Sequence, residues 1–131
     1  MQSRRSILRS VLLLVAGMVV SGALLSAERP FNDAEFDAAQ RAGTPVLIAV
    51  HADWCPTCRV QEEALWELLA RKQFAGISVF RVDYDLQKAA LKRFGVRAQS
   101  TLIVFKGKKE VARSIAQTDR DAIAADLAKS L

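Results

Sequence analysis

An apolar run followed closely by two cysteines restricts the possible folds of this chain more than any other feature of its sequence. Residues 46–50 are all apolar and of strand length, which predicts a strand buried on both faces at the centre of an α/β sheet. Cys55 and Cys58, the only two cysteines among 131 residues, follow after a short loop, and residues 59–72 are rich in helix formers. The sequence therefore predicts a buried strand, a loop and a helix that begins at the cysteines.

Helices and strands alternate through the rest of the chain. Asn32 is the predicted N-cap of a first helix, with Glu35 completing a capping box and Phe31 packing against Phe36 as a hydrophobic staple. The residues expected on the buried face of the helix after the cysteines are Val60, Ala64, Leu65, Leu68 and Leu69. Further strands are predicted over 77–84, 101–105 and 110–115, and further helices over 86–95 and 121–131, the last capped within 118–121. This order predicts one α/β domain over residues 28–131.

The first 27 residues differ in composition from that domain. Three arginines precede residues 10–27, which are uncharged and mostly apolar, and the first acidic residue is Glu28. This pattern predicts an export signal, with cleavage after Ala27 or Ala23. Residues 3–9 resemble the twin-arginine export pattern, so that route and the general one both stay open. Because 18 uncharged residues approach the length that spans a bilayer, an uncleaved inner-membrane anchor with the domain facing the periplasm is the alternative.

The charge of the chain does not indicate a nucleic-acid partner. Of 19 basic and 14 acidic residues, Arg4, Arg5 and Arg9 lie in the predicted signal, so 16 basic residues stand against 14 acidic ones in the rest. The densest basic cluster is residues 106–109, where a glycine between two apolar strands favours a solvated hairpin turn over a phosphate site.

The position of the cysteines indicates thiol chemistry. Cys55 lies at the expected helix start, and Pro56 suits the first helical turn, where a missing N–H costs no hydrogen bond. A thiolate at Cys55 would face unpaired amides and the positive end of the helix dipole, so a lowered pKa and an attacking role are expected. Cys58, one turn later, is placed to attack the resulting mixed disulfide and release the substrate.

Two other interpretations of the cysteines stay open. A fixed structural disulfide would close too short a loop to add much stability. A metal or an iron–sulfur cluster could be held by Cys55 and Cys58 with His51, although zinc sites usually need four ligands.

Residues 46–58 and 80–113 resemble the active-site segment and the following strand, helix and hairpin of the thioredoxin superfamily, and the similarity extends over most of residues 31–131. Within the superfamily, the chain is similar to the C-terminal domain of membrane thiol:disulfide interchange proteins. The resemblance implies a central mixed sheet of about four strands flanked by helices, and an exported dithiol reductase acting on protein disulfides. It implies a redox-active Cys55–Cys58 disulfide with no other cofactor, and a membrane electron donor of the interchange-protein type.

One departure from the family lies at Ser100, which precedes Thr101 where thioredoxins have a cis-proline beside the active site. A trans peptide bond before Ser100 is favoured, because a cis bond before a non-proline residue costs about 3 kcal/mol. Serine also offers a hydroxyl and a more mobile surface than proline, so we expect a more open site that suits a particular partner. The residues expected to shape the substrate site are Trp54, Pro56, Thr57, Ser100 and Thr101.

A second departure concerns proton transfer. Ala49 stands where thioredoxins have a buried aspartate that helps move the proton of the resolving thiol, and Arg81 stands at the position of a nearby lysine. His51 is the only imidazole of the chain and a candidate proton relay; alternatively, it packs against Trp54 or caps the loop. Asp53 is expected to accept backbone hydrogen bonds in that loop rather than to take part in the chemistry.

Overall fold

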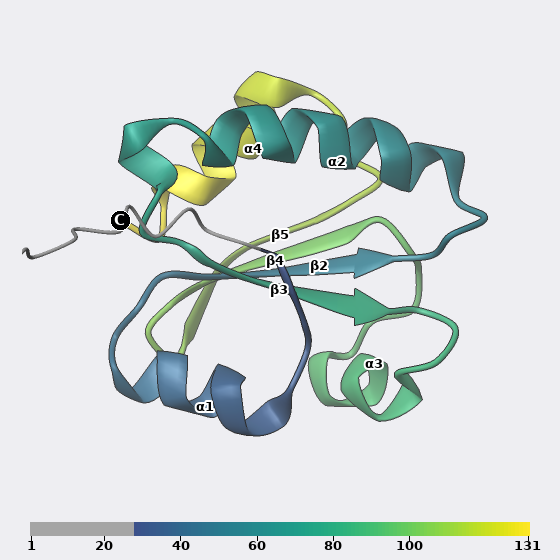
Figure 1. The fold of residues 1–131 in the computed structure, drawn as a ribbon, viewed down its shortest axis with the longest axis horizontal. Coiled ribbons are helices and arrows are strands. Elements are labelled where there is room, and N and C mark those ends of the chain that lie inside the picture. The colour runs from purple at the N-terminus through teal and green to yellow at the C-terminus, as the bar shows by residue number, and fades with distance from the viewer. Residues whose placement is uncertain (1–27) are drawn as a thin grey trace, which may run out of the picture.

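Five strands form a mixed sheet in the computed structural model, which describes residues 28–131 (Figure 1). The strands are β1 (Arg29–Pro30), β2 (Val46–His51), β3 (Ser78–Asp83), β4 (Thr101–Lys106) and β5 (Lys109–Ile115). Their order in the sheet is β1-β3-β2-β4-β5, with β1, β3 and β2 parallel and β4 antiparallel to both β2 and β5. The helices are α1 (Asp33–Arg41), α2 (Pro56–Leu69), α3 (Lys88–Phe94) and α4 (Arg120–Ala128), with a short 3-10 helix η1 (Lys72–Phe74). Helices α1 and α3 cover one face of the sheet and α2 and α4 the other.

The α/β prediction is confirmed, but the sheet has five strands instead of about four. The additional strand, β1, pairs with Phe80 and Arg81 of β3. Two residues are too few to show the alternation by which a strand is recognised in a sequence. The predicted export signal, residues 1–27, lies outside the described residues. Within residues 28–131, no helix is both long and apolar enough to cross a membrane.

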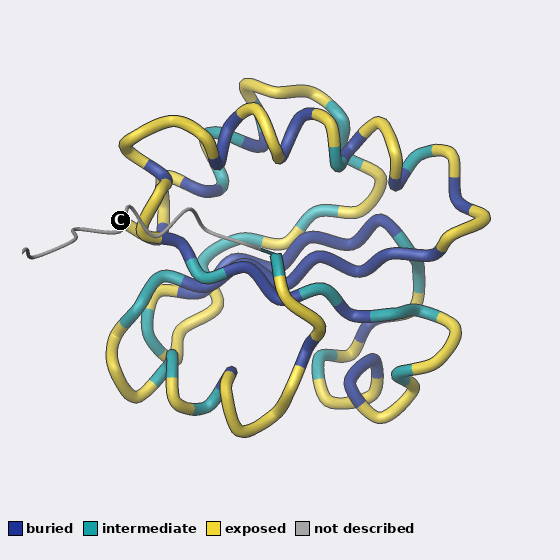
Figure 2. Tube along the Cα trace, viewed as in Figure 1, coloured by how far each residue is buried: buried dark blue, intermediate teal, exposed yellow. Residues whose placement is uncertain are grey.

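Strand β2 is buried along its whole length, as the apolar run predicted (Figure 2). Successive side chains of a strand point to opposite faces. Leu47 and Ala49 therefore belong to the core beneath α2 and α4, and Ile48 and Val50 to the core beside α1 and α3. This burial holds the carboxyl end of β2, and the loop that follows it, in a fixed position.

The buried face of α2 differs from the predicted one at its start. Val60 is 53% exposed, whereas the polar Gln61 is buried. The inward-facing residues follow the three- and four-residue spacing of one helix face, and they are Cys58, Gln61, Ala64, Leu65, Leu68 and Leu69. The buried face of α2 therefore begins at Cys58, and Val60 lies on the exposed side of the helix.

The predicted caps are largely confirmed. The Asn32 side chain accepts a hydrogen bond from the Glu35 N–H at 3.1 Å, and the rings of Phe31 and Phe36 lie 5.8 Å apart. The Glu35 carboxylate does not complete the capping box, because it pairs with Arg29 at 3.4 Å. Within the segment predicted to cap α4, the N-cap is Asp119.

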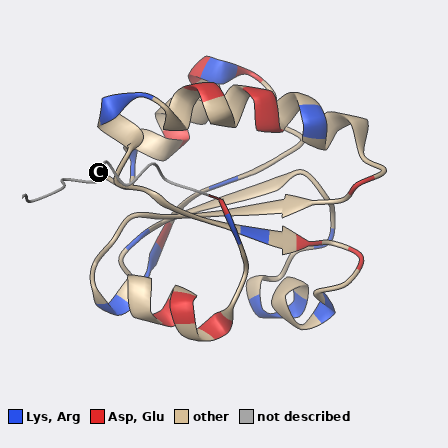
Figure 3. Cartoon of the chain, in the orientation of Figure 1, with Lys and Arg blue, Asp and Glu red and all other residues tan. Residues whose placement is uncertain are grey.

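Helices α1 and α3 lie side by side and carry opposite charges (Figure 3). The guanidinium of Arg93, near the end of α3, pairs with both Asp33 and Asp37 of α1. The same guanidinium lies over the rings of Phe36 and Phe94, 4.9 and 5.6 Å from their centroids. These contacts join the two helices on the sheet face opposite α2.

Candidate active site

Cys55 is the N-cap residue of α2. Its backbone is extended, and its Sγ accepts a hydrogen bond from the N–H of Cys58 at 3.1 Å, with Pro56 in the first helical turn. The Cys55 N–H donates to the carbonyl of Ala52 at 3.0 Å, which fixes the loop after β2. A sulfur thus occupies the place where Ser or Asp usually satisfies the free amides of a helix start.

The two thiols have pKa values displaced in opposite directions. Burial raises the pKa of Cys55, but hydrogen bonds from the Cys58 thiol, the Ser100 hydroxyl and the backbone N–H groups of Cys58 and Thr57 outweigh burial, and the pKa is lowered. The pKa of Cys58 is raised by its own burial and by the neighbouring Cys55. Cys55 therefore ionises at a lower pH than Cys58 does, in agreement with the lowered pKa that the sequence predicted for Cys55.

Ser100 lies directly beside both sulfurs. Its Oγ is 3.3 Å from the Sγ of Cys55 and 3.0 Å from the Sγ of Cys58. The peptide bond before it is trans, in agreement with the prediction, and its φ is 58°, in the left-handed region that non-glycine residues rarely adopt. Ser100 is 2% exposed, so the expectation of an open surface at this position is wrong.

Backbone hydrogen bonds hold Ser100 in that conformation. Its N–H donates to the carbonyl of Val50 at 2.9 Å, and its carbonyl accepts from the N–H of Ala116 at 2.9 Å. The side chain of Gln61 donates to the same carbonyl at 3.1 Å and to the carbonyl of Gln117 at 2.8 Å. Gln61 was not predicted as a site residue; the available signal was a polar residue one turn after Cys58 on the inward face of α2.

Thr101 does not contact the thiols in this way. Its hydroxyl donates to the carbonyl of Ala98 at 2.7 Å, and its side chain is buried. Thr101 therefore shapes the site indirectly, by fixing the loop that carries Ser100.

The rim of the site is more exposed than its centre. Trp54 is 57% exposed, and its indole N–H donates to the carboxylate of Asp85 at 2.8 Å. Pro56 is exposed and Thr57 partly so, whereas Cys55 and Cys58 are 2% and 1% exposed. An incoming disulfide must therefore contact the rim before it reaches Cys55, which fits the predicted contact role of Trp54.

His51 lies in a group of charged residues at the end of β2. Its Nε2 is within hydrogen-bond distance of an Asp53 carboxylate oxygen, at 3.1 Å. Its Nδ1 is 2.6 Å from Glu62 Oε1, but these two atoms are not aligned as in a regular hydrogen bond. The guanidinium of Arg81 lies 3.5 Å from Glu62 and 3.8 Å from Asp53. Asp53 thus contacts side chains of this group, and among residues 28–131 its carboxylate does not accept the backbone hydrogen bonds that were predicted for it. Both ring nitrogens of His51 face carboxylates, and its role as a proton relay stays a prediction.

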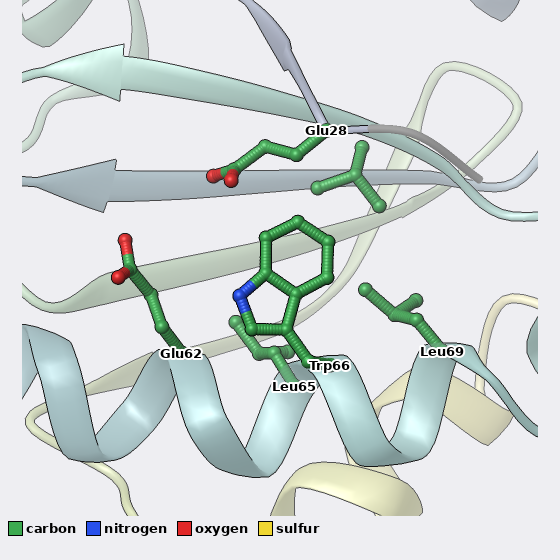
Figure 4. A pocket seen from close by; sticks show the side chains of 6 residues that line it. Glu28, Glu62, Leu65, Trp66 and Leu69 are labelled. Atoms are coloured by element: carbon green, nitrogen blue, oxygen red, sulfur yellow. The ribbon is translucent and has the colours of Figure 1, made fainter. Parts of the chain in front are cut away.

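Glu28 extends the charged group along an apolar hollow. The hollow is lined by Glu28, Glu62, Leu65, Trp66, Leu69 and Val79, and Figure 4 shows both carboxylates on the same side of the Trp66 ring. Burial raises the pKa of Glu28, opposed by Arg81 at 3.8 Å. Arg81 is also the register partner of Ala49, the position where thioredoxins have a buried aspartate. The carboxylates that contact Arg81 here belong instead to Glu62 of α2 and to Glu28.

The metal-binding alternative finds no support in the arrangement of the side chains. Among residues 28–131, no three His, Cys, Asp or Glu side chains come together in a way that could hold a metal ion. His51, which that alternative places beside the two cysteines, has its ring nitrogens next to Asp53 and Glu62 instead.

A buried dithiol at a helix start, with one thiol activated and one protonated, defines a thiol-disulfide oxidoreductase. The chain belongs to the thioredoxin family, whose model, described as thioredoxin, matches residues 28–129. A thioredoxin from Alicyclobacillus acidocaldarius is 31% identical over 100 residues, which cover 76% of this chain and 94% of that protein. Protein disulfide-isomerase erp38 from Neurospora crassa is 33% identical over 101 residues, 75% of this chain and 27% of that protein.

Solved structures agree with this assignment. The crystal structure of Trxlp from Edwardsiella tarda EIB202 superposes with a TM-score of 0.75 at 46% identity, covering 77% of this chain and 98% of that one. The closer resemblance to membrane interchange proteins stays a prediction from the sequence.

Proposed function

We propose that this thioredoxin-family oxidoreductase is exported to the periplasm, where it reduces disulfides of other proteins with electrons from a membrane donor. The observation that carries the proposal is the opposite displacement of the two thiol pKa values at the start of α2. This difference separates an attacking thiol from a resolving one, as reduction of a protein disulfide requires.

The reaction consists of two exchanges. The Cys55 thiolate attacks a substrate disulfide, one substrate sulfur leaves as a thiolate that takes up a proton, and a mixed disulfide forms. Cys58 then loses its proton and attacks Cys55, so the mixed disulfide breaks, the second substrate sulfur leaves and a Cys55–Cys58 disulfide forms. Two electrons have passed to the substrate, and a dithiol donor returns the protein to its reduced form by the reverse exchanges.

The proposed location rests on the N-terminal segment of the sequence. The basic residues and the uncharged stretch of residues 10–27 have the composition of an export signal or an anchor. An oxidising periplasm gives a reductase no local supply of electrons, so the proposal includes a membrane partner that transfers them across.

Fusion of residues 1–35 to a reporter that is active only after export is expected to give a periplasmic signal. Replacement of both Arg4 and Arg5 by Lys is expected to abolish that signal if the twin-arginine route is used, and to leave it unchanged if the general route is used. A reporter fused to residues 28–35 alone is the matched control. An inactive fusion with the full segment would contradict export.

The reduction potential of the dithiol is expected to be near that of a reductant such as thioredoxin, about −270 mV. The reason is that a dithiol that reduces protein disulfides needs a potential below theirs, whereas strong stabilisation of the Cys55 thiolate would stabilise the reduced form and raise the potential. Equilibration of residues 28–131 with glutathione buffers, followed by alkylation of the free thiols, measures the potential. A value near about −120 mV, typical of strong disulfide oxidants, would overturn the proposed direction.

A further inference from the structure

We propose that the hydroxyl of Ser100 is a catalytic group that donates a hydrogen bond to the Cys58 sulfur as it leaves as a thiolate, when a dithiol donor reduces the Cys55–Cys58 disulfide. The hydroxyl acts only as a hydrogen-bond donor, and its proton stays on Ser100. This inference rests on the proposed function, because it concerns the return of the same reductase to its reduced form.

The first argument is the distance between the hydroxyl and the Cys58 sulfur. Ser100 Oγ lies 3.0 Å from Cys58 Sγ and 3.3 Å from Cys55 Sγ, and either atom of each pair can be the donor. Cys58 is a free cysteine in this structure, as it is once it has left Cys55, so the distance describes the surroundings of the departed sulfur. The hydroxyl therefore contacts a reacting atom directly.

The second argument is that the hydroxyl has one proton and two sulfurs to serve. In the resting reduced protein Cys55 is the thiolate, so Ser100 donates to Cys55 and accepts from the Cys58 thiol. When Cys55 is bonded to a donor sulfur, it carries no charge and the negative charge lies on Cys58. The hydroxyl then rotates toward Cys58, because a hydrogen bond to a charged acceptor is stronger than one to a neutral acceptor.

The third argument concerns the other groups around Cys58. Burial and the Cys55 thiol raise the pKa of Cys58, and the Ser100 hydroxyl and the backbone N–H of Ala52 oppose this rise. The carbonyl of Val50, 4.0 Å from the sulfur, only accepts. Cys58 is 1% exposed, and in such a site a hydrogen bond stabilises a charge more than it does in water. A more stable thiolate leaves faster.

The fourth argument is that the hydroxyl is held in place before the reaction. Ser100 has a φ of 58°, its N–H donates to the carbonyl of Val50, and its own carbonyl accepts from the Ala116 N–H and the Gln61 side chain. Ser100 is also buried. A donor that is already in position costs no reorganisation when the charge develops.

The two exchanges balance in protons and electrons. A donor thiolate attacks Cys55 Sγ, the bond between Cys55 and Cys58 breaks, and its electron pair leaves on Cys58, which accepts the hydrogen bond from Ser100. The second donor thiol then loses its proton to the solvent and attacks the first donor sulfur. Cys55 leaves as a thiolate, and Cys58 takes up one proton. The donor is now a disulfide, and two electrons have passed to the protein.

The first measurement is the ionisation of Cys58, followed by the ultraviolet absorbance of the thiolate against pH. Cys55→Ala is the background, because Cys58 is then the only cysteine of the chain. In this background, Ser100→Ala and Ser100→Gly are each expected to raise the midpoint by about one pH unit, since the thiolate loses a donor. Ala116 adopts a φ of 56° in this protein and glycine adopts such angles without strain, so both variants fit the backbone.

The second measurement is the rate at which dithiothreitol reduces the oxidised protein with both cysteines present. Ser100→Ala and Ser100→Gly are each expected to slow this reduction roughly three- to tenfold, because the leaving thiolate is less stable. Both substitutions remove atoms beside the sulfurs and would speed a step limited by access, so slowing is not a steric effect. Ser130→Ala is the matched control, because Ser130 is equally buried and its hydroxyl donates to the carbonyl of Leu127.

An unchanged midpoint of Cys58 in both Ser100 variants would overturn the inference, and so would reduction by dithiothreitol at the unchanged rate. Equal changes in Ser130→Ala would also overturn it, because they would indicate a general effect of losing a buried hydroxyl. In each case normal exchange by the unchanged protein leaves the proposed function intact. An unchanged protein whose disulfide dithiothreitol does not reduce would instead overturn the proposed function, and this inference with it.

Discussion

Replacement of Cys58 by Ser is expected to leave the protein covalently attached to its substrates through Cys55, whereas Cys55→Ser is expected to abolish exchange. Cys55 at the start of α2 has the lowered pKa and the amide hydrogen bond, so it forms the first bond to the substrate. Without Cys58, no thiol can break that bond from within the protein. Non-reducing gels and mass spectrometry of trapped complexes measure the result.

The pH dependence of alkylation tests the same assignment. In Cys58→Ser, the rate at Cys55 is expected to fall only as the pH drops below a midpoint lower than that of an unfolded thiol, because the thiolate is the reactive form. Unfolded Cys58→Ser in denaturant provides the reference thiol. Complexes trapped by Cys55→Ser through Cys58 would reverse the two roles.

Replacement of Phe36 by Ala is expected to have the largest effect on stability, lowering the free energy of unfolding by about 3–5 kcal/mol. Phe36 is buried, and its ring contacts four others, those of Phe31, Phe80, Phe94 and Phe105. The variant leaves a cavity where α1 packs on the sheet, and the loss is a large share of the stability of an ordinary domain. Urea denaturation measures the change.

Trp66→Ala is the control for that experiment. Trp66 is about half exposed on the other face of the sheet, so loss of its larger ring is expected to destabilise the protein less. Equal losses from the two variants would contradict the idea that burial, rather than ring size, decides the effect. Below its unfolding transition, Phe36→Ala is expected to exchange disulfides at the normal rate.

The parts of this protein that could be predicted from the sequence are those decided by neighbours along the chain. The apolar run of β2, the cap at Asn32 and the thiol at the start of α2 each depend on a few adjacent residues. Cys55 and Cys58 were recognised for the same reason, since helix geometry alone places them one turn apart.

The surroundings of the thiols could not be predicted in this way, because strand pairing brings them from distant segments. Ser100 reaches the cysteines through the pairing of β4 with β2, and its burial follows from contacts with Ala116 and Gln61. A serine in a loop gives no local signal of such enclosure. Glu62 contacts Arg81 because α2 packs on the sheet. The sequence predicted this packing, but it did not predict which residues at the start of α2 face the sheet.

The burial of Cys55 and Cys58 also affects how long the two thiols stay reduced in the absence of a substrate. Oxidation of a cysteine to sulfenic acid depends on both thiolate character and exposure. Cys55 has the first property, but at 2% exposure it meets dissolved peroxide rarely. Small oxidants therefore oxidise the dithiol slowly. A protein disulfide that binds at the rim near Trp54 reaches Cys55 and is reduced faster. For the exported reductase proposed above, this enclosure means that few electrons are lost to oxidants other than its protein substrates.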